Sequence, residues 1–418
     1  MPVLLSDLNQ GQRAGYDGIV SWLIDPGLPI YVLGGSAGTG KSTLMRAFLD
    51  NVDKVHETLR LIDPRYRPLE LALTATTHPA VDNLSRITEK DAQTIHSFLD
   101  LRLQRNYKAN TTKLVPKAGA PLKERFLVIV DEASYIDDEL MRHLMQRTSE
   151  CKLLFIGDPY QLCSPRSRHS PVFTRNYPGT ELTEIMRQAA GNPIMDWATQ
   201  LREIVRTGQF HPLKPDGQAI RHVDDATFEQ LVVDEFTRPD WQFSDSKLLS
   251  YTNERSIQFN NFIQSRLTGD ATFKAGDYAV VNAFVQGASF TLKNNETVYI
   301  SEIEPAQEYG VNGYSILLNG RFLVFMPAHR ADKKALLNRL RAEENWTIVK
   351  VIEDNWVDLR AAFSCTINKS QGDTFDRVFI DLSDLSRVTT GDMLYRLLYV
   401  GVSRARQQVI LRGDIIPT

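Results

Sequence analysis

Apolar runs that end in small or charged residues recur along the first 180 residues of the chain. The run "PIYVL", which begins at Pro29, precedes a glycine-rich turn, and "TLMRAFLDNV" then shows apolar residues at helical spacing. The runs "RFLVIV" and "KLLFIG", which begin at Arg125 and Lys152, have the same apolar character. Short apolar strands that alternate with helices predict a parallel sheet with helices on both faces.

The same alternation returns in the second half of the chain. The segment "LLSYTN" reads as a strand, and "ERSIQFNNFIQSRL" follows it with a helical period. The apolar positions of that period are Ile257, Phe259, Phe262, Ile263 and Leu267. Together with the apolar runs of the last fifty residues, this segment predicts a second α/β lobe.

From about Thr268 to Asn355, apolar and polar positions alternate between glycine and asparagine turns. The stretches "DYAVVNAFVQ" and "GYSILLNGRFLVFMPA" are typical of antiparallel strands and predict a small β-barrel. The segment "DKKALLNRLRAEENW" then predicts a basic amphipathic helix. Its basic face could contact DNA, but a solvated face packed through Leu336, Leu337 and Leu340 is at least as well supported.

The stretch from Asp100 to Arg125 interrupts the first lobe with an excess of basic residues. Asp100 and Glu124 are its only acidic residues, and Asn110 and Gly119 are turn formers. The basic residues are Arg102, Arg105, Lys108, Lys113, Lys117, Lys123 and Arg125. A solvated loop is the usual meaning of such a charge run.

Composition bounds the class of protein. A chain of 418 residues should hold two to four domains, and 42% hydrophobic with 24% charged residues is ordinary for a soluble globular protein. The net charge of −3 gives no global positive field, although a nucleic-acid channel needs only local positive charge.

Cysteine usage and the lack of long apolar runs predict a cytoplasmic location. Cys151, Cys163 and Cys365 lie far apart without metal-type spacing, so we expect free thiols in a reducing compartment. No apolar run approaches the roughly 18–20 residues of a membrane span. The N-terminus lacks a basic region followed by an apolar core, so we expect no signal peptide and no membrane partner.

The glycine-rich turn "GGSAGTGKST" fits the pattern G-x-x-x-x-G-K-[ST] through Gly35, Gly40, Lys41 and Ser42. Between a strand and a helix, backbone N–H groups of such a loop surround phosphate oxygens at the positive end of the helix. Lys41 can reach the β and γ phosphates, and Ser42 can ligate Mg²⁺. The residues predicted to bind the nucleotide here are Gly35, Ser36, Ala37, Gly38, Thr39, Gly40, Lys41, Ser42 and Thr43.

Two more apolar runs end in candidate catalytic groups. In "RFLVIVDEAS", Asp131 is placed to hold the metal and Glu132 to orient and deprotonate an attacking water, unless both are a solvated strand end. A glutamate directly after the metal aspartate favours hydrolysis over transfer to a small molecule. In "KLLFIGDPYQL", Gln161 can sense the γ-phosphate or position water. Parallel strands would bring these residues to one sheet edge beside the phosphate loop.

Two arginines complete the candidate set. Arg187 follows "LTEIM", and Arg404 lies in "LLYVGVSRARQQVIL" near Arg406. Charge builds up on the phosphates during transfer, and an arginine fork stabilises it. A surface salt bridge is the usual role of a lone arginine.

In this order, the motifs resemble those of superfamily-one helicases of the RecD-like branch over nearly the whole chain. The matching blocks are "LNQGQR", "GGSAGTGKST", "TATTHPAVDNL", "TIHSFL", "VIVDEAS", "FIGDPYQL", "LTEIMRQ", "YTN", "INKSQGDTFD" and "YVGVSRAR". The resemblance implies that Gln12 reads the adenine edge and that Arg187 and Arg404 are arginine fingers that act across a cleft between two lobes.

The resemblance also implies contacts to single-stranded DNA. These belong to Thr77, His78, Thr94 and His96 in the first lobe, although Thr94 could instead cap a helix and His96 could be a buried histidine. The second lobe would contribute Asn368, Lys369 and Ser370, with Gln371 near the nucleotide. Asn368 replaces the histidine that is common in the family; it keeps a hydrogen-bond donor and loses a titratable group.

For the fold, the resemblance implies α/β architecture with two RecA-like P-loop lobes. The predicted limits are 1–99 with 124–180 for the first lobe and 181–267 with 356–418 for the second. The family places a β-hairpin, the pin that splits the duplex, at 100–123, and Tyr107 is our candidate for the residue that stacks on the last base pair. The antiparallel insertion at 268–355 resembles the family's SH3-like barrel with a helix.

The function implied is ATP-dependent unwinding of DNA with Mg²⁺, in replication, recombination or repair. We further expect movement 5′-to-3′ along a single strand and forked DNA as the substrate. A single-strand-binding protein, or a replication or recombination protein, would be a partner, and the chain would act as a monomer. The location would be the host cytoplasm if a phage encodes the chain. A P-loop phosphotransferase and a strand-binding ATPase that remodels without unwinding remain open as alternatives.

Overall fold

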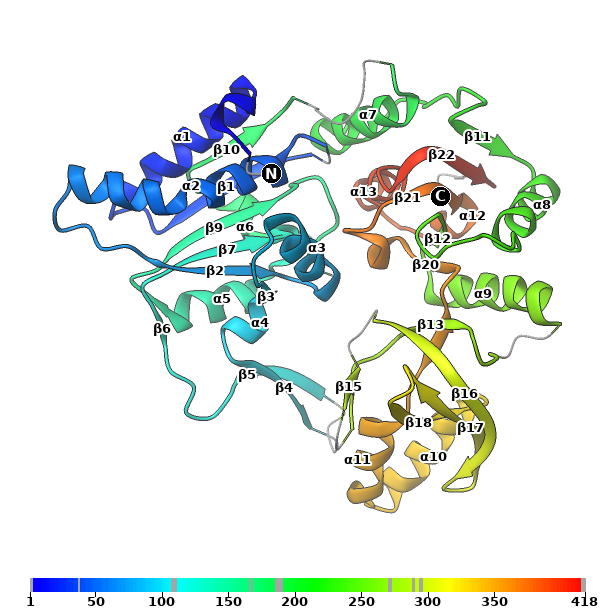
Figure 1. Ribbon diagram of the computed structural model, residues 1–418. Helices are drawn as coiled ribbons and strands as arrows, with labels where there is room; N and C mark the ends of the chain where they lie inside the picture. The colour runs from blue at the N-terminus through cyan, green and yellow to red at the C-terminus, as the bar shows by residue number, and fades with distance from the viewer. Residues whose placement is uncertain are drawn as a thin grey trace. The chain divides into compact units, whose positions relative to one another are not determined.

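The computed structural model describes residues 3–36, 38–106, 111–164, 167, 169–184, 191–269, 273–287, 290–292 and 296–414 (Figure 1). The chain divides into two compact units. The first comprises Met1–Leu103 and Leu114–His211, and the second comprises Gln104–Lys113 and Pro212–Thr418. The predicted lobe limit at 181 differs from this division, because residues up to His211 group with the first unit.

The first unit is built on a six-stranded sheet whose strands are all parallel, as the alternation of apolar runs predicted. The spatial order is β10-β1-β9-β7-β2-β3. The strands are β1 Ile30–Gly35, β2 Glu70–Ala75, β3 Gln93–Thr94, β7 Phe126–Asp131, β9 Lys152–Gly157 and β10 Gly179–Leu182.

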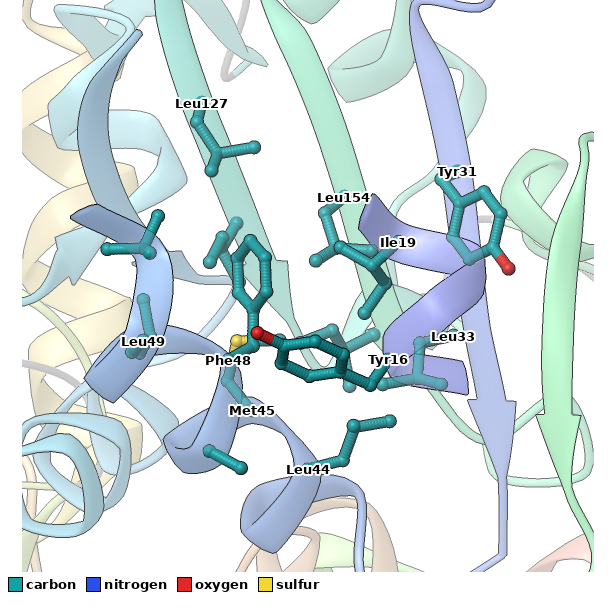
Figure 2. Packing of buried hydrophobic residues seen from close by; sticks show 14 of the residues in the cluster. Tyr16, Ile19, Tyr31, Leu33, Leu44, Met45, Phe48, Leu49, Leu127 and Leu154 are labelled. Atoms are coloured by element: carbon teal, nitrogen blue, oxygen red, sulfur yellow. The ribbon is translucent and has the colours of Figure 1, made fainter. Parts of the chain in front are cut away.

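Helices cover both faces of this sheet because successive strand residues point to opposite sides. Leu127 and Leu154 pack under α1 and α2, whereas their neighbours Val128 and Phe155 pack on the side of α4 and α5. Figure 2 shows the first of these faces, with Phe48 of α2 packed among apolar side chains of the strands. The helices and 3₁₀ turns of this unit are η1 Leu5–Asp7, α1 Gln10–Ile24, α2 Lys41–Ile62, α3 His78–Thr88, α4 Ile95–Phe98, η2 Ala133–Tyr135, α5 Asp138–Arg147, α6 Pro171–Thr174 and α7 Pro193–Thr207.

The basic insertion forms a hairpin of β4 Leu101–Asn106 and β5 Thr111–Pro116. Its base is fixed in the first unit by an ion pair of 2.8 Å between Lys123 Nζ and Asp100. Arg147 of α5 donates to the carbonyls of Leu99, Ala120 and Pro121 across the same base. Short strands β6 Lys123–Glu124 and β8 Thr148–Ser149 pair beside it. Tyr107 lies outside the described residues, so its part in a pin stays a prediction.

The second unit contains another all-parallel sheet, in the order β11-β22-β21-β12-β20. The strands are β11 Ile220–Val223, β12 Ser246–Ser250, β20 Ser364–Thr366, β21 Phe375–Asp381 and β22 Ala405–Arg412. The helices and the 3₁₀ turn are α8 Asp225–Phe236, α9 Asn253–Thr268, η3 Ile367–Ser370, α12 Leu382–Leu385 and α13 Gly391–Val402. Two parallel α/β sheets confirm the predicted fold class.

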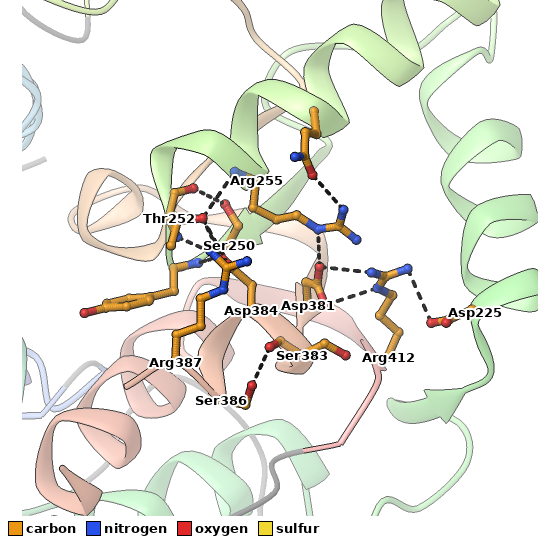
Figure 3. Close-up of polar contacts among 12 residues, drawn as sticks. Asp225, Ser250, Thr252, Arg255, Asp381, Ser383, Asp384, Ser386, Arg387 and Arg412 are labelled. Carbon is orange, nitrogen blue, oxygen red and sulfur yellow. Dashed lines mark hydrogen bonds and ion pairs between the residues drawn. The ribbon is translucent and has the colours of Figure 1, made fainter. Parts of the chain in front are cut away.

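A buried ion network joins the strand ends of this sheet to its helices (Figure 3). The Asp381 carboxylate is fully buried and accepts from Arg255 Nε at 2.6 Å and from Arg412 Nε and Nη2 at 3.1 Å. Arg412 Nη1 lies 3.3 Å from Asp225 of α8. Because the buried carboxylate is paired with two guanidinium groups, its burial is compensated and the network fixes the helices on the sheet.

The insertion in the second unit contains a five-stranded antiparallel sheet in the order β18-β17-β16-β13-β19. The strands are β13 Tyr278–Val281, β16 Thr297–Glu308, β17 Val311–Leu318, β18 Phe322–Pro327 and β19 Leu359–Ala361, with a separate pair β14 Val285–Gln286 and β15 Thr291–Leu292. The sheet passes the predicted limit at 355 because β19 pairs with β13. Its likeness to an SH3 barrel stays a prediction.

The predicted helix after these strands is α10 Arg330–Ala342, followed by α11 Trp346–Asn355. Leu336, Leu337 and Leu340 are buried against β17 and α11, which is the packing that the leucine spacing indicated. Among the described residues, no helix has both the length and the apolar character needed to cross a bilayer.

Candidate active site

The phosphate loop follows β1 at the carboxyl edge of the first sheet. Gly38 and Gly40 have φ values of 84° and 81°, in the left-handed region that favours glycine. A side chain at Gly35 would lie 2.7 Å from Thr39 Oγ1 and 3.0 Å from the Leu182 carbonyl, so this position has room only for glycine. Ala37 lies outside the described residues.

Lys41 begins α2 and points back into this loop. Its Nζ donates to the carbonyls of Gly35 at 2.6 Å and Ser36 at 3.0 Å. Thr39 Oγ1 donates to the same Ser36 carbonyl at 2.9 Å. The ammonium group is thus held where phosphate oxygens would accept from it, at the positive end of a 22-residue helix. Ser42 and Thr43 are exposed in the first turn of that helix.

Asp131 and Glu132 lie at the end of β7 on the same edge. Asp131 Oδ1 accepts from the Glu132 N–H at 2.9 Å. Desolvation raises the pKa of Asp131, and the Glu132 N–H and the Lys41 charge oppose that rise. The charge of Lys41 therefore acts on Asp131, so the loop and the strand end form one electrostatic site.

A divalent cation fits beside this carboxylate, because it would hold Asp131 ionised in a desolvated position. Within the described ranges, no three His, Cys, Asp or Glu side chains gather as a ready-made metal site. A cation would therefore depend on Asp131, the Ser42 hydroxyl and phosphate oxygens, a donor set that suits Mg²⁺.

Glu132 has a left-handed backbone with φ 51°, which is uncommon outside glycine. Its carbonyl accepts from Thr76 Oγ1 at 3.1 Å and from the Tyr135 N–H at 3.1 Å. These two bonds hold the strained residue in place at the strand end. Strain of this kind, about 1–3 kcal/mol, is often retained at functional sites.

We expect Glu132→Gln to bind ATP and Mg²⁺ but to hydrolyse ATP about 10²–10⁴-fold more slowly, because the amide keeps the shape and loses the base. Nucleotide affinity and DNA-stimulated turnover, measured on one preparation, test this. Glu139→Gln, a change on the neighbouring helix α5, is the control. Normal turnover by Glu132→Gln would show that Glu132 is not the base.

Gln161 follows β9 in a tight turn at the same edge. Asp158, 1% exposed, accepts from the Tyr160 N–H at 2.9 Å, and the Gln161 N–H donates to the Asp158 carbonyl at 3.3 Å. A side chain at Gly157 would come within 3.2 Å of the Ala133 N–H. The ends of β9 and β7 are therefore in close contact, and Gln161 shares the edge with Glu132.

Gln12 of α1 reaches the phosphate loop. Its Nε2 donates to the Gly40 carbonyl at 3.3 Å, and its Oε1 accepts from the Asn9 N–H at 3.0 Å. The residue is 1% exposed. This position next to the loop agrees with a residue of the nucleotide site, and the adenine contact stays a prediction.

Arg202 belongs to this site and was not singled out by the sequence. From the middle of α7, its Nη1 donates to Ser36 Oγ at 2.9 Å. The Ser36 carbonyl accepts from Lys41, so Ser36 connects both cations. The segment 193–207 reads as an ordinary amphipathic helix, and nothing in its pattern marks Arg202.

We expect Arg202→Ala to raise the KM for ATP about 3–10-fold, since a single hydrogen bond contributes about 0.5–1.5 kcal/mol. The KM and kcat of DNA-stimulated hydrolysis test this. Arg206→Ala is the matched control, because Arg206 lies one turn further on α7, is exposed and pairs with Glu203. An unchanged KM for Arg202→Ala would contradict a part in nucleotide binding.

The predicted strand contacts of the first unit lie at helix starts. Thr77 and Thr94 cap α3 and α4, accepting from the N–H groups of Ala80 and Ser97. The capping alternative for Thr94 is therefore correct, and a DNA contact would be an addition to it. His78 and His96 are half-buried, and burial lowers the pKa of His96. Their contacts to DNA remain predictions.

In the second unit, the block "INKSQG" forms η3 and the residues after it. Ser370 is fully buried and donates to the Ile367 carbonyl at 2.8 Å, so its hydroxyl supports the turn. Lys369 Nζ donates to Asn282 Oδ1 of the insertion. Asn368 is half-buried and Gln371 is 7% exposed.

Arg404 lies between α13 and β22 and is 5% exposed. Its guanidinium donates to the carbonyls of Val400 and Asp373 at 3.0 and 3.1 Å and to Ser403 Oγ at 2.8 Å. Arg406 is instead exposed and pairs with Asp376. Arg187 lies outside the described residues. Both arginine fingers therefore stay predictions.

Two family models and several known proteins match this chain. The family model of the AAA domain matches residues 7–225, and that of the UvrD-like helicase C-terminal domain matches residues 361–412. The ATP-dependent DNA helicase Dda of Enterobacteria phage T4 is 25% identical over 453 aligned positions, which cover 96% of this chain and 98% of that protein. The ATP-dependent DNA helicase PIF1 of Candida albicans is 28% identical over 165 positions, which cover 36% of this chain and 16% of that protein.

A solved structure of a Pif1 helicase has the same fold. That structure comes from work on DNA unwinding at forked duplexes by two coordinating Pif1 helicases. Its TM-score is 0.51 at 15% identity, and the match covers 98% of this chain and 92% of that one. The AAA-domain match spans more than half of the 418 residues and includes the phosphate loop, Asp131, Glu132 and Gln161. The chain therefore belongs to the AAA domain family, and it is a superfamily-one helicase close to Dda.

Proposed function

We propose that this protein is an ATP-dependent DNA helicase that moves along a single strand and separates duplex DNA. One observation carries the proposal: Lys41, Asp131, Glu132 and Gln161 come to one edge of a parallel sheet, with the Lys41 charge acting on Asp131. This arrangement suits hydrolysis, because a base stands directly beside the metal position. The Dda and PIF1 relatives are both ATP-dependent DNA helicases.

Each residue of the edge has a distinct task in this proposal. Lys41 binds the β and γ phosphates, and Glu132 takes a proton from the attacking water that Gln161 helps to orient. Arg187 and Arg404 stabilise the charge that develops on the phosphates. When bound, Mg²⁺ supplies charge neutralisation at the phosphates, and Ser42 and Asp131 would hold it.

Strand contacts belong to Thr77, His78, Thr94 and His96 in the first unit and to Asn368–Ser370 in the second. The proposal also includes movement 5′-to-3′, a role for Tyr107 in splitting the duplex, and action as a monomer. Forked DNA as the substrate also belongs to the proposal, as does a single-strand-binding, replication or recombination protein as a partner. A phosphotransferase is disfavoured, because it gives no role to the second parallel sheet or to the block at 367–371.

ATP hydrolysis with and without single-stranded DNA tests this proposal, together with strand separation on duplexes that carry a 5′ or a 3′ tail. A helicase requires stimulation by DNA and unwinding from one tail polarity. Stimulation without unwinding would support a strand remodeller. Hydrolysis that ignores DNA would support a phosphotransferase and would overturn the proposal.

A further inference from the structure

A groove of the second unit lies between α8 and α9, and its residues are not part of the site described above. Its volume is about 170 Å³, and its apolar lining is formed by Phe228, Val232, Phe259 and Phe262. A cavity of about 150 Å³ with an apolar lining can hold a benzene ring. The groove therefore has room for one apolar side chain of a binding partner.

The rim of this groove carries more negative than positive charge. α8 contains four acidic residues and no basic residue, and one of the four, Glu229, is exposed and lines the groove. On α9, exposed Glu254 lies one turn before Gln258, which also lines the groove. Arg266 of α9 is exposed and stacks on Phe262 at 5.2 Å from the ring centroid. The carboxylates of Glu229 and Glu254 thus exceed this cation by one charge.

The other charges beside the groove compensate one another within the ion network (Figure 3). Arg255, which lines the groove, donates to Asp381 at 2.6 Å. Arg412 donates to the same carboxylate at 3.1 Å and lies 3.3 Å from Asp225. Two guanidinium groups and two carboxylates give this network no net charge. The excess at the rim therefore favours an occupant that is apolar and positively charged.

The first unit exposes two apolar side chains at the end of α2. Leu61 is 86% exposed and Ile62 is 63% exposed, whereas Leu59 of the same turn is buried in the core. The packing of α2 on the sheet therefore does not depend on Leu61 or Ile62. Single exposed apolar residues are normal on a protein surface, so the charges around these two decide what they suit.

Those charges are mainly positive. From Arg60 to Arg67, here called the tip segment, the chain holds three arginines, all exposed, and one carboxylate, that of Asp63. Asp63 lies 3.2 Å from Arg65 Nε, so this pair is compensated. Arg60 and Arg67 remain as excess positive charge beside the apolar pair. The tip segment thus has the apolar and basic character that the groove favours.

We propose that the tip segment of one copy of this chain docks in the α8–α9 groove of a second copy, with Leu61 as the apolar anchor. The excess arginines of the segment then lie near Glu229 and Glu254, and complementary charge fixes the orientation of the contact. Because the tip segment and the groove are different surfaces, the contact is heterologous and joins copies head to tail.

The inference rests on the proposed function, because a strand has a polarity and orients every copy that binds it in the same way. A head-to-tail contact joins copies of equal orientation. One helix end in one groove is smaller than the roughly 1,200–2,000 Å² that stable interfaces bury, so we expect free copies to associate weakly. Neighbours on one strand reach effective concentrations on the order of mM, which favours the contact. Each copy keeps its own phosphate loop and can still hydrolyse ATP alone.

Anisotropy titrations of two fluorescent oligo(dT) strands test the contact, one long enough for a single copy and one twice as long. We expect the wild type to bind the longer strand cooperatively, with a tighter second copy. Leu61→Ser should reduce this preference for the second copy roughly tenfold, because a buried leucine anchor is lost. Its affinity for the short strand should be unchanged, which shows that the variant is folded. Leu323→Ser is the matched control, at a leucine of the second unit that is 68% exposed.

An exchange of charges tests whether the occupant is a second copy. Arg60→Glu and Glu229→Arg change exposed residues, and each alone should reduce the cooperativity about 2–5-fold, because like charges then meet. In an equimolar mixture of the two variants, every mixed pair of neighbours has opposite charges again. The mixture should therefore bind the longer strand more cooperatively than either variant alone.

Equal affinities of the first and second wild-type copies would overturn the inference, and so would wild-type cooperativity in Leu61→Ser. A mixture without recovery would mean that the groove takes a basic segment of a different protein, and the assignment to a second copy would be wrong. The proposed function is judged separately, by wild-type binding to the short strand and DNA-stimulated hydrolysis. If these are present and cooperativity is absent, only the contact is rejected; if the short strand is not bound, the proposed function fails and the inference with it.

Discussion

Replacement of Lys41 by alanine is expected to abolish ATP turnover and to leave the fold intact. The ammonium group is expected to supply positive charge at the β and γ phosphates, and the partners to which it donates among the described residues are the carbonyls of Gly35 and Ser36. The core contacts of α2 are made by apolar residues such as Leu44 and Phe48, which the substitution does not touch. The measurement is DNA-stimulated hydrolysis beside a thermal melt.

Lys54→Ala is the matched control, because Lys54 lies on α2 and is exposed. It should keep wild-type hydrolysis. If Lys41→Ala kept that rate as well, the loop 34–43 would not be the phosphate loop. If the melting temperature fell by many degrees in Lys41→Ala but not in Lys54→Ala, Lys41 would have a structural role instead.

Replacement of Arg404 by alanine is expected to slow hydrolysis about 10³–10⁵-fold with little loss of ATP affinity, the size of effect of arginine fingers in other phosphate-cleaving enzymes. The guanidinium acts on charge that exists only in the transition state, so ground-state binding should not need it. Single-turnover hydrolysis and nucleotide affinity measure the two quantities separately.

The burial of Arg404 requires a check on stability. Alanine would leave the Asp373 carbonyl without this donor, at about 1–3 kcal/mol for an unsatisfied group, whereas the Val400 carbonyl would still accept from Ser403 Oγ. Arg404→Lys keeps the charge at this position. Arg406→Ala is the control for the region, because Arg406 is exposed. A folded Arg404→Ala protein that hydrolyses ATP at the normal rate would exclude Arg404 from the active site.

The strands that carry the site could be predicted because each is a buried apolar run that ends in a chemically distinctive residue. Asp131 and Gly157 end β7 and β9; β9 is buried along its length, and β7 is buried except at its two end residues. Edge strands β10 and β11 have four residues each, too short to show a period. Their pairing depends on neighbours far away in the chain.

Arg202 could not have been found from the sequence. The contact between Arg202 and Ser36 spans 166 positions, and local patterns carry no information about such a pair. Thr94 is different, since the cap was foreseen as an alternative and the structure shows it.

The strand order of the two parallel sheets has a consequence for the order of folding during synthesis. Every strand of the six-stranded sheet has left the ribosome once Leu182 has emerged. In the five-stranded sheet, the last strand in sequence, β22, lies between β11 and β21 and carries Arg412 of the ion network. Because domains generally fold as units in the order of their synthesis, the nucleotide-binding half can form co-translationally, whereas the other half must await its final strand. Until then β11 has no neighbour and Asp381 lacks one of its two guanidinium partners, so the nascent chain exposes a sheet edge for chaperones to protect.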